Sequence, residues 1–515
     1  MSQPDAPPSG PDFRQGVALA ELPAHGVLAG HVAGEAALLV RTADGLRIVG
    51  AHCTHYGAPL AEGRVEGDQV HCPWHHACFD LRTGAATGAP AFAPLPIWRV
   101  EVVHDTIYAR DPVPFSPPAG RRWRAAPDEG QVRAPHASPR RILIIGGGAA
   151  GYAAARRLRD CGFDGAVTML SADADPPCDR PNLSKDFLAG TAPAEWIPLQ
   201  DAQAYRDQDI DLRLGCDVAA IDPAARIAHA SQGEFAYDAL LLATGAEPRR
   251  LALPGFDAGQ VQVLRSLADA RAIVEVAAEA RHVAFVGAGF IGLEAAAALR
   301  ARGLDVSVVA PEVIPLERVL GAQLGAHLAA LHRAHGVALH LGRKPTRLED
   351  GRLHLDDGTR LAAEVIIVGA GVVPRTRLAV AAGMHVEDGV MVDARLETSL
   401  PGHYAAGDVA RYPHAGGSAR VEHWVHAQRM GQRAADNMLG DQRAFDDVPF
   451  FWTQQYDLAL RASGHLSGWD EVRMEGDPAS GDFIARYARG GRLVAAAAAG
   501  RDRELLDLEA VLAAG

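Results

Sequence analysis

Short apolar runs separated by glycine and proline fill the first part of the chain. Residues 37–42, 46–51 and 97–110 are rich in aliphatic and β-branched side chains, which is the pattern of β-strands. Two more runs, at residues 17–22 and 68–72, have a similar composition and are predicted as strands too. Because these runs are short and follow one another closely, they predict a small all-β domain.

A different pattern begins at residue 141. The apolar run at 141–145 leads into a glycine-rich turn and then into an alanine-rich helical stretch. The same order of strand, glycine turn and helix returns at residues 281–303. Each copy is followed by another apolar strand, at 166–171 and at 305–310. This internal repeat predicts two doubly wound α/β domains.

The tail mixes strands at 458–464, 482–489 and 492–499 with a terminal helix at 503–514, and is predicted as an α+β domain. A stretch rich in proline and arginine near residue 120 has no periodic apolar positions and is interpreted as a linker. The predicted division is an all-β domain at 13–112, a linker at 113–139, a first α/β domain at 140–258 that resumes at 384–445, a second α/β domain at 259–383, and the C-terminal domain at 446–515.

Composition narrows the class of protein. The 515 residues are 48% hydrophobic and 22% charged, as in ordinary globular proteins, and their length calls for several domains. The formal net charge of −13 argues against a nucleic-acid partner. No apolar run is long enough for a membrane span, and the N-terminus lacks a signal-peptide pattern. We therefore expect a cytoplasmic protein without a membrane span.

Four residues of the first domain form a metal-ligand pattern. Cys53 and His55 make a C-x-H motif, and Cys72 and His75 make a C-x-x-H motif sixteen residues later. Two thiolates and two imidazoles at this spacing are the ligands of a Rieske [2Fe–2S] cluster, in which two cysteines hold one iron and two histidines the other. A structural zinc site is the alternative, although such sites more often use C-x-x-C pairs.

Each α/β domain carries a dinucleotide-binding glycine motif between its strand and its helix. Glycines let the backbone approach a pyrophosphate, which lies at the positive N-terminus of the helix. Asp173, about twenty residues after the first motif, is placed to hold a ribose hydroxyl. The two motifs predict two different dinucleotides. Their glycines are Gly146, Gly148 and Gly151 in the first domain and Gly287, Gly289 and Gly292 in the second.

Four further stretches carry a family resemblance: residues 176–188, 237–255, 404–412 and 451–464. They resemble segments of flavin-dependent ferredoxin reductases of the oxygenase type and of the apoptosis-inducing-factor group, within the pyridine nucleotide-disulfide oxidoreductase superfamily. With the N-terminal Rieske pattern, the chain resembles the Rieske-containing, apoptosis-inducing-factor-like reductases. The redox-active cysteine pair of glutathione-reductase relatives is not matched, since Cys161 and Cys178 have the wrong spacing.

The resemblance implies roles for individual residues. Lys185 and Glu294 resemble a catalytic ion pair beside the flavin, and Trp424 and Trp452 resemble aromatic residues near it. Glutamate often stands where this chain has Ala310, and Glu312 is the expected substitute on the nicotinamide side. No arginine cluster follows immediately, which favours NADH over NADPH. The residues implied to bind FAD are Gly146, Gly148, Gly151, Asp173, Arg180, Lys185, Thr244, Gly245, Gly407, Asp408 and Trp424.

The function that follows is an NADH-dependent FAD oxidoreductase that feeds a fused Rieske cluster, and through it an external acceptor such as a ferredoxin, a cytochrome or an oxygenase. Two alternatives stay open. One is a redox signalling protein of the apoptosis-inducing-factor type. The other is a reductase of a separate ferredoxin, in which the Rieske domain serves only for docking. A homodimer is an open alternative for the oligomeric state.

Overall fold

The computed structural model describes residues 9–24, 26–115, 139–415 and 417–514. The chain divides into two compact units that are each formed by separate stretches of sequence. Unit 1 contains Met1–Pro127, Arg156–Phe163 and Arg501–Gly515, and unit 2 contains Asp128–Ala155 and Asp164–Gly500. Most of the linker predicted at 113–139 lies outside the described residues. The domain boundaries given above stay a prediction.

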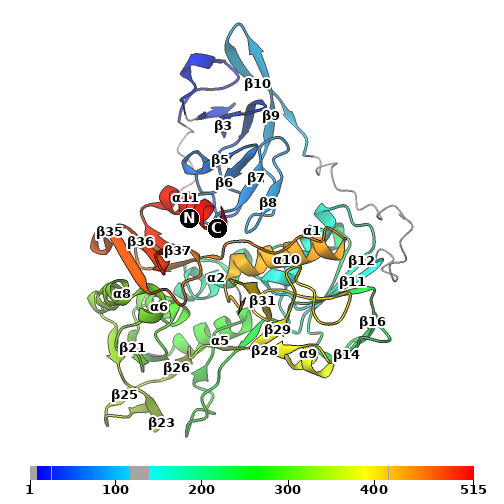
Figure 1. Cartoon of the computed structure of the whole chain (residues 1–515). Coiled ribbons are helices and arrows are strands. Elements are labelled where there is room, and N and C mark those ends of the chain that lie inside the picture. Colours follow the sequence, from blue (N-terminus) through cyan, green and yellow to red (C-terminus); the bar gives the residue numbers. More distant parts are fainter. Residues whose placement is uncertain (1–8, 25, 116–138, 416, 515) are drawn as a thin grey trace. The chain divides into compact units, whose positions relative to one another are not determined.

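Two antiparallel sheets form most of unit 1 (Figure 1). The larger sheet has the order β1 (Val17–Ala18), β10 (Thr106–Val113), β9 (Ile97–Val103), β4 (Gly45–Gly50), β3 (Glu35–Thr42) and β2 (Val27–Val32). The smaller sheet has the order β5 (Arg64–Glu66), β6 (Gln69–His71), β7 (Cys78–Asp80) and β8 (Ala86–Gly88). The predicted all-β domain is confirmed. One predicted strand is too long, because after β1 the chain turns into the 3-10 helix η1 (Leu19–Glu21).

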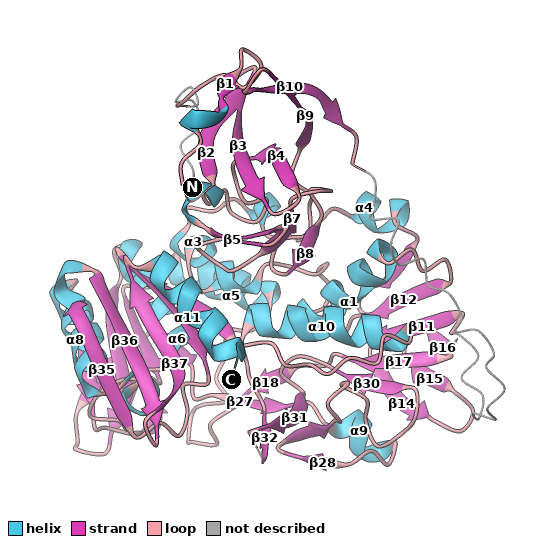
Figure 2. Ribbon diagram, turned by 45° about the horizontal axis from the view of Figure 1, so that its top comes forward, coloured by secondary structure: helices cyan, strands magenta, loops and turns pink. Residues whose placement is uncertain are grey.

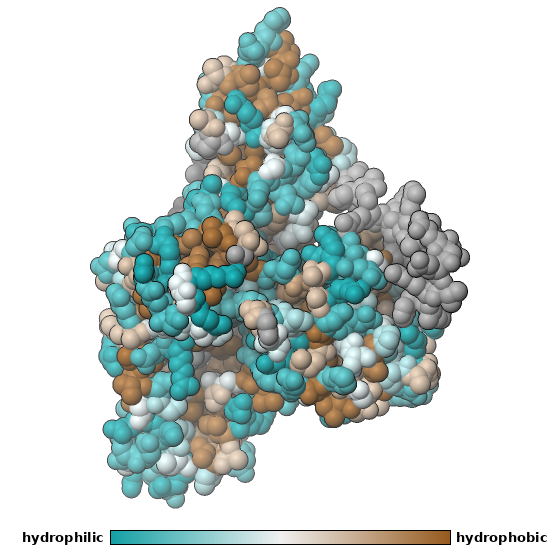
Figure 3. All heavy atoms as spheres, in the orientation of Figure 1, coloured by the Kyte–Doolittle hydropathy of each residue, from teal (hydrophilic) through white to brown (hydrophobic). Residues whose placement is uncertain are grey.

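Hydrophobic side chains of the β9–β10 hairpin stay at the surface of unit 1. Val102, Val103 and Val113 are all exposed, and Figure 3 shows hydrophobic residues on this part of the molecule. Scattered apolar residues are normal on protein surfaces, so this patch by itself needs no functional explanation.

Helix α11 (Asp502–Ala514), close to the C-terminus, also belongs to unit 1. Figure 1 shows it next to β5, which agrees with the contacts between the two elements. The Arg503 guanidinium donates to the carbonyl of Gly63 at 2.7 Å, and Glu509 contacts His76. Two stretches at opposite ends of the sequence therefore build one unit.

Unit 2 contains two parallel sheets of five strands each. The first has the order β13 (Ile210–Arg213), β12 (Ala166–Leu170), β11 (Arg141–Ile145), β17 (Ala239–Leu242) and β30 (His403–Ala405). The second has the order β22 (Ala338–Leu341), β21 (Asp305–Ala310), β20 (His282–Val286), β26 (Val365–Val368) and β19 (Val261–Gln262). Strand β30 joins the first sheet only after the chain has completed the second sheet. Both predicted α/β folds are confirmed.

Helices pack beside these sheets, as the buried and branched side chains of the strands require. In Figure 2, α1 (Ala149–Asp160) and α10 (Trp424–Met438) run next to the first sheet. In the second, buried alanines of α6 (Phe290–Ala301) and side chains of α5 (Leu267–Ala277) share one core with β20 and β21. Short helices complete this part of unit 2: α2 (Arg180–Leu183), α3 (Asp186–Ala189), η3 (Ala194–Trp196), α4 (Ala202–Asp207) and α9 (Arg377–Ala381). Two small sheets consist of β14 (Val218–Asp222), β15 (Ile227–Ala230) and β16 (Gly233–Ala236), and of β18 (Ala246–Pro248) and β27 (Val372–Pro374). Two more consist of β23 (Pro345–Glu349), β24 (Arg352–Leu355) and β25 (Arg360–Ala362), and of β28 (Val386–Glu387), β29 (Gly389–Met391), β31 (Ala410–His414) and β32 (Gly417–Ala419).

A third, antiparallel sheet ends unit 2. Its order is β33 (Phe450–Gln455), β34 (Leu458–Gly464), β37 (Arg492–Ala499), β36 (Asp482–Arg489) and β35 (Glu471–Asp477). Its inner face shares a core with α7 (Glu317–Leu320) and α8 (Ala322–Ala334), and Figure 2 shows α8 beside β35 and β36. This packing ties the third sheet to the second α/β sheet.

Both glycine turns have the same strained geometry. Gly146 and Gly287 have φ values of +120° and +116°, which side-chain-bearing residues rarely adopt. A Cβ on Gly146 would lie 2.1 Å from the carbonyl oxygen of Ala243, and one on Gly287 would lie 2.3 Å from that of Gly369. Each turn therefore needs glycine, because it brings the strand end against a neighbouring backbone just before a helix begins.

Candidate redox sites

Two loops of unit 1 present the predicted metal ligands in the same backbone arrangement. The amide of Cys53 donates to the carbonyl of Ala58, and the amide of Cys72 donates to that of Ala77, each at 2.8 Å. In both loops the donor and the acceptor are five residues apart. Two loops of matching shape can thus present one cysteine and one histidine each to a common centre.

The four side chains converge as pairs of like ligands. The Nδ1 atoms of His55 and His75 lie 3.2 Å apart, and the Cys53 and Cys72 thiols are hydrogen-bonded. This contact with Cys72, together with burial, raises the pKa of Cys53, while burial lowers the pKa of His55 to about 3. Neutral imidazoles on one side and two sulfurs on the other fit a [2Fe–2S] cluster with two protein ligands on each iron.

No group of three or more histidine, cysteine or acidic side chains within the described stretches is arranged to hold a metal ion. A two-iron cluster needs only two protein ligands per iron, which the pairs supply. All six cysteines lie within the described ranges and none forms a disulfide. The Cys78 thiol, next to the ligand loop, donates to the side-chain amide oxygen of Gln69 at 3.2 Å.

Aromatic and acidic groups surround the histidine ligands. The Tyr56 ring stacks on His55 with 3.9 Å between centroids and meets His75 edge-on at 5.4 Å. His76, which follows the ligand His75, is buried, and its ring contacts the Glu509 carboxylate of α11. The ligand loop is thus fixed by contacts on both sides.

A large cavity in unit 2 holds most of the residues expected to bind nucleotides. Its volume of about 1550 Å³ exceeds the roughly 300–1,000 Å³ of pockets that hold one small ligand. The predicted residues on its wall are Gly146, Gly148, Asp173, Arg180, Lys185, Thr244, Gly245, Gly289, Gly292, Glu294, Gly407, Asp408, Trp424 and Trp452. Gly151, Gly287 and Glu312 are not among its lining residues.

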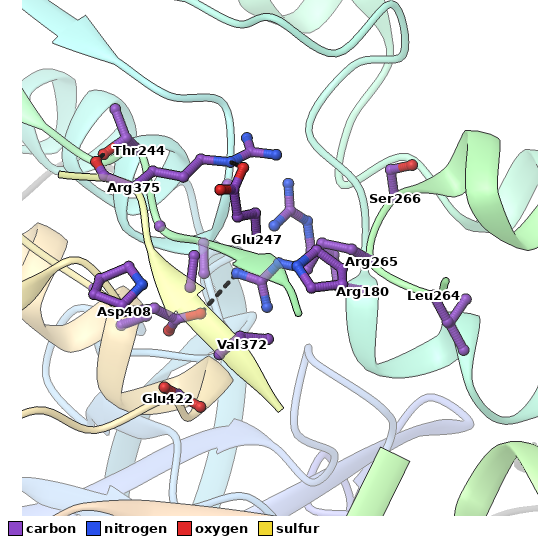
Figure 4. Close-up of a pocket in the computed structure, with 18 of the residues that line it drawn as sticks. Arg180, Thr244, Glu247, Leu264, Arg265, Ser266, Val372, Arg375, Asp408 and Glu422 are labelled. Atoms are coloured by element: carbon purple, nitrogen blue, oxygen red, sulfur yellow. Dashed lines mark hydrogen bonds and ion pairs between the residues drawn. The ribbon is translucent and has the colours of Figure 1, made fainter. Parts of the chain in front are cut away.

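Two guanidinium groups, those of Arg180 and Arg265, lie on the wall of the cavity (Figure 4). Arg180 pairs with Asp173 at 3.1 Å, and its guanidinium carbon lies 3.8 Å from the position a Cβ on Gly148 would take. Arg265 pairs with Asp408 at 2.7 Å, while its Nε has no hydrogen-bond partner in the structure. A glycine turn at a helix N-terminus, with two arginines on the wall of the same cavity, fits the pyrophosphate of FAD. Arg265 was not predicted, because it lies outside every sequence motif.

The Lys185 ammonium and the Glu294 carboxylate lie 2.7 Å apart on the cavity wall. Ser184 and Thr453 each donate a hydroxyl to the same carboxylate at 2.6 Å. The Trp452 ring centroid is 6.0 Å from the Lys185 ammonium. The predicted pair therefore forms in this structure. Its two hydroxyl donors were not predicted, although both belong to stretches that carried the resemblance.

The remaining predicted residues take different places. Thr244 donates to the carbonyl of Arg375 at 3.0 Å, and Trp424 begins α10. Gly407 has φ +78° and packs against Ala150, so a side chain there would crowd the first glycine turn. Glu312 is exposed on the loop after β21, where its carbonyl accepts from the Gly342 amide at 2.9 Å.

Comparison with known proteins decides the family. The model for pyridine nucleotide-disulphide oxidoreductases matches residues 140–431. The chain belongs to this family. A Rieske [2Fe-2S] domain model matches residues 17–99 and a reductase C-terminal model matches residues 450–515, which identifies the protein as a Rieske-containing reductase. The predicted resemblance is confirmed. As a Rieske-containing member of this family, the protein is an oxidoreductase that uses FAD, NAD(P)H and a [2Fe–2S] cluster.

Individual relatives agree with this assignment. Human apoptosis-inducing factor 3 is 32% identical over 93% of this chain and 80% of its own length. The 5,5'-dehydrodivanillate O-demethylase ferredoxin reductase subunit of Sphingobium sp. (strain NBRC 103272 / SYK-6) is 38% identical over 72% of this chain and 93% of its own. Among solved structures, the covalent putidaredoxin reductase–putidaredoxin complex aligns with a TM-score of 0.70 at 31% identity, covering 73% of this chain and 93% of that chain.

Within the described stretches, no helix has both the length and the apolar character needed to cross a membrane.

Proposed function

We propose that this oxidoreductase takes electrons from NADH and passes them, through FAD and its own Rieske cluster, to an external acceptor protein. The observation that carries the proposal is the presence on one chain of a paired two-thiol, two-imidazole site and a reductase with two glycine turns. When bound, FAD accepts a hydride from a nicotinamide and releases electrons singly, and the [2Fe–2S] cluster carries one electron at a time.

We assign the first glycine turn to FAD. Gly146, Gly148 and Gly151 leave room for the pyrophosphate, and Arg180 and Arg265 would neutralise its charge. Asp408 and Asp173 are the acidic groups available for sugar hydroxyls, each held in place by one of these arginines. These assignments rest on the cavity wall and on the family match.

We assign the second glycine turn to the nicotinamide dinucleotide. Gly289 and Gly292 line the same cavity as the flavin residues, so one space can receive both dinucleotides. Glu312 is the acidic group closest to the end of β21, where it would bind the adenosine ribose of NADH and repel the phosphate of NADPH. Comparing kcat/KM for the two nucleotides tests this preference.

The Lys185–Glu294 pair has an electrostatic role in this proposal. Lys185 places a positive charge at the cavity wall, where it would stabilise negative charge that develops in the cavity. Glu294 offsets that charge, and Lys185 also donates to the Pro181 carbonyl at 3.1 Å, which fixes the position of the ammonium. No general acid or base is needed from the protein for hydride transfer.

The acceptor is proposed from the relatives. Several of them are named as ferredoxin reductase components of oxygenase systems, including the anthranilate 1,2-dioxygenase and p-cumate 2,3-dioxygenase systems. We therefore infer a ferredoxin, cytochrome or oxygenase as the external partner. A homodimer is part of the proposal only as an alternative, which sedimentation of the holoprotein would decide.

Anaerobic titration of the holoprotein with NADH tests the internal relay. We expect the flavin absorbance to bleach and the electron paramagnetic resonance signal of a reduced Rieske cluster to follow. Flavin bleaching without the cluster signal contradicts the relay. If the rate of cluster reduction does not depend on protein concentration, transfer between freely diffusing chains is excluded.

His75→Ala separates the relay from a docking role. Loss of one imidazole ligand should abolish reduction of an external ferredoxin or cytochrome, while NADH still reduces the flavin at the normal rate. His52→Ala is the matched control, because His52 is exposed and stands beside Cys53 without being a predicted ligand. Unchanged reduction of the external acceptor by His75→Ala would support the docking alternative instead.

A further inference from the structure

The Glu294 carboxylate is bound by three side-chain donors, and both of its oxygens are used. Lys185 and Ser184 donate to Oε2 at 2.7 and 2.6 Å, and Thr453 donates to Oε1 at 2.6 Å. Glu294 lies in the second turn of α6 and is almost completely buried. A buried carboxylate with this many donors is fixed in position, since each of its oxygens is hydrogen-bonded.

The Thr453 hydroxyl is the end of a longer chain of buried polar groups. Gln455 donates from Nε2 to the Thr453 oxygen at 3.3 Å, and its Oε1 lies 2.8 Å from Nε2 of His332. Thr453, Gln455 and His332 are each at most 1% exposed. Thr453 and Gln455 are two residues apart on β33, so they project from the same face of the strand.

This series of hydrogen-bonded side chains reaches the surface of unit 2 at the end of α8. The Tyr456 hydroxyl lies 3.5 Å from Nδ1 of His332, and the Tyr456 ring stacks on His335 with 3.6 Å between centroids. Tyr456 is half-buried and His335 is exposed. A continuous polar path thus crosses the buried core from the cavity wall to the surface of unit 2.

With the Gln455 amide oriented as in the structure, the hydrogen bonds of this path share one direction. In the structure the Gln455 side-chain oxygen Oε1 faces His332, and because this oxygen can only accept, the arrangement places the His332 proton on Nε2. The other ring nitrogen of His332 is then an acceptor, which the Tyr456 hydroxyl can supply with a proton. Because Gln455 donates to the Thr453 oxygen, the Thr453 proton is directed at Glu294.

Tyr456, His332, Gln455 and Thr453 therefore each donate to the next group along the path, and Thr453 donates to the Glu294 carboxylate. Burial lowers the pKa of His332, which is consistent with the neutral imidazole that this arrangement requires. Hydrogen bonds that run in one direction polarise one another, so each donor strengthens the next. The last hydrogen bond of the path, from Thr453, is made to the Glu294 carboxylate.

We propose that Thr453 is a positioning residue for the Lys185–Glu294 pair, and that Gln455, His332 and Tyr456 keep its hydroxyl directed at Glu294. These hydrogen bonds hold the Glu294 carboxylate in place, and so hold the Lys185 ammonium at the cavity wall. This inference rests on the proposed function for the importance of the pair in hydride transfer. The direction of the hydrogen bonds does not depend on that function.

The tautomer of His332 tests the direction of the chain without any turnover. In the holoprotein labelled with ¹⁵N-histidine, long-range proton–nitrogen correlation spectra should show neutral His332 with the proton on Nε2. The signal is assigned by its loss in His332→Asn. A proton on Nδ1, or a charged ring at neutral pH, would overturn the proposal.

Thr453→Val tests whether Thr453 and His332 are coupled through the hydrogen bonds of Gln455. Valine has the shape of threonine without the hydroxyl, so Gln455 loses its acceptor and the His332 nitrogen signals should shift. Thr346→Val is the matched control, because the Thr346 hydroxyl bonds only to the carbonyl of His354 in a separate small sheet. Unchanged His332 signals in Thr453→Val would contradict the coupling.

The rate of flavin reduction tests the effect on the pair. Thr453→Val should slow single-turnover reduction by NADH about tenfold, the size expected for one lost hydrogen bond to a charged group, with little change in the dissociation constant of NADH. Thr453→Ser should restore most of the rate. An unchanged rate in Thr453→Val overturns this inference alone, whereas a wild-type flavin that NADH cannot reduce overturns the proposed function.

Discussion

At the scale of single residues, the Lys185–Glu294 pair makes a prediction about stability. Removing one partner of a buried pair leaves the other charge uncompensated, which costs about 3 kcal/mol. Glu294→Leu should therefore lower the temperature at which heated protein releases its flavin, measured by flavin fluorescence. The double variant Lys185→Met with Glu294→Leu should recover part of that loss. A double variant less stable than Glu294→Leu would contradict the pairing.

Three histidines of unit 2 predict how the free energy of unfolding depends on pH: His426, which is buried, and His423 and His465, which are half-buried. Burial lowers the pKa of His423 and of His465 to about 4, and the pKa of His426 well below its usual value. Above about pH 6.5 these groups are neutral in both the folded and the unfolded state, so they contribute nothing. Between about pH 6.5 and pH 4 only the unfolded chain binds the protons, so the free energy of unfolding falls as the pH falls.

His465→Asn should flatten this dependence by up to about one proton. The measurement is the midpoint of thermal unfolding of the flavoprotein over that pH range. His385→Asn is the control, because the His385 side chain is exposed. An equal slope in His465→Asn and in the unmodified protein would contradict the assignment of His465.

The residues that the sequence could predict are those with a fixed spacing. Cys53, His55, Cys72 and His75 are close in the chain because each ligand loop supplies one thiol and one imidazole. Arg265, Ser184 and Thr453 were not predicted as site residues. Their partners lie more than a hundred residues away, and no local pattern encodes such a contact. Glu312 was predicted by its place after a strand, and its role stays a prediction.

At the scale of elements, the contact between α10 and α1 depends on one glycine. A Cβ on Gly431 of α10 would lie 2.1 Å from the carbonyl oxygen of Ala150, at the start of α1. Gly431→Ala should force the two helices apart at the first glycine turn, at a cost of about 3 kcal/mol. We expect a lower ratio of flavin to protein after purification.

Gly259→Ala is the matched control for this variant, because the space around Gly259 is open and its backbone is not in the left-handed region. A flavin content in Gly431→Ala equal to that of Gly259→Ala would show that the helices can separate without affecting the site.

Strands with a strong apolar pattern were predicted to the residue. β21, β34, β36 and β37 begin and end as the sequence indicated. Strands of three residues, such as β5, β7 and β8, were not predicted, because so short a segment has no readable alternation and exists only through pairing. The segment at 17–22 was wrong as a strand beyond Ala18, since its apolar residues are accommodated by a helical turn instead.

At the scale of the whole molecule, α11 connects the C-terminal part of the chain to the unit that carries the cluster ligands. From the sequence, this helix was predicted to belong to the C-terminal domain at 446–515, because it directly follows the strands of that domain in the chain. In the structure Glu509 pairs with His76, directly after the ligand His75. An amphipathic helix does not encode which surface it will cover.

Glu509→Ala should weaken the cluster site. His76 loses its acidic partner in a buried position, which costs about 1–3 kcal/mol, and the ligand loop is held less firmly. We expect faster loss of the cluster's visible absorbance under a fixed concentration of iron chelator. Val511→Ala is the matched control, since Val511 is an exposed residue of the same helix. Equal rates in the two variants would contradict a role for Glu509.

Unit 1 is built from stretches that are far apart in the sequence, so its parts are synthesised at different times. During synthesis the ribosome makes the two ligand loops hundreds of residues before α11, so the contact with His76 can form only after α11 has been made. The reductase strands are synthesised in the interval. Final closure of the iron–sulfur unit therefore follows synthesis of the flavin-binding unit.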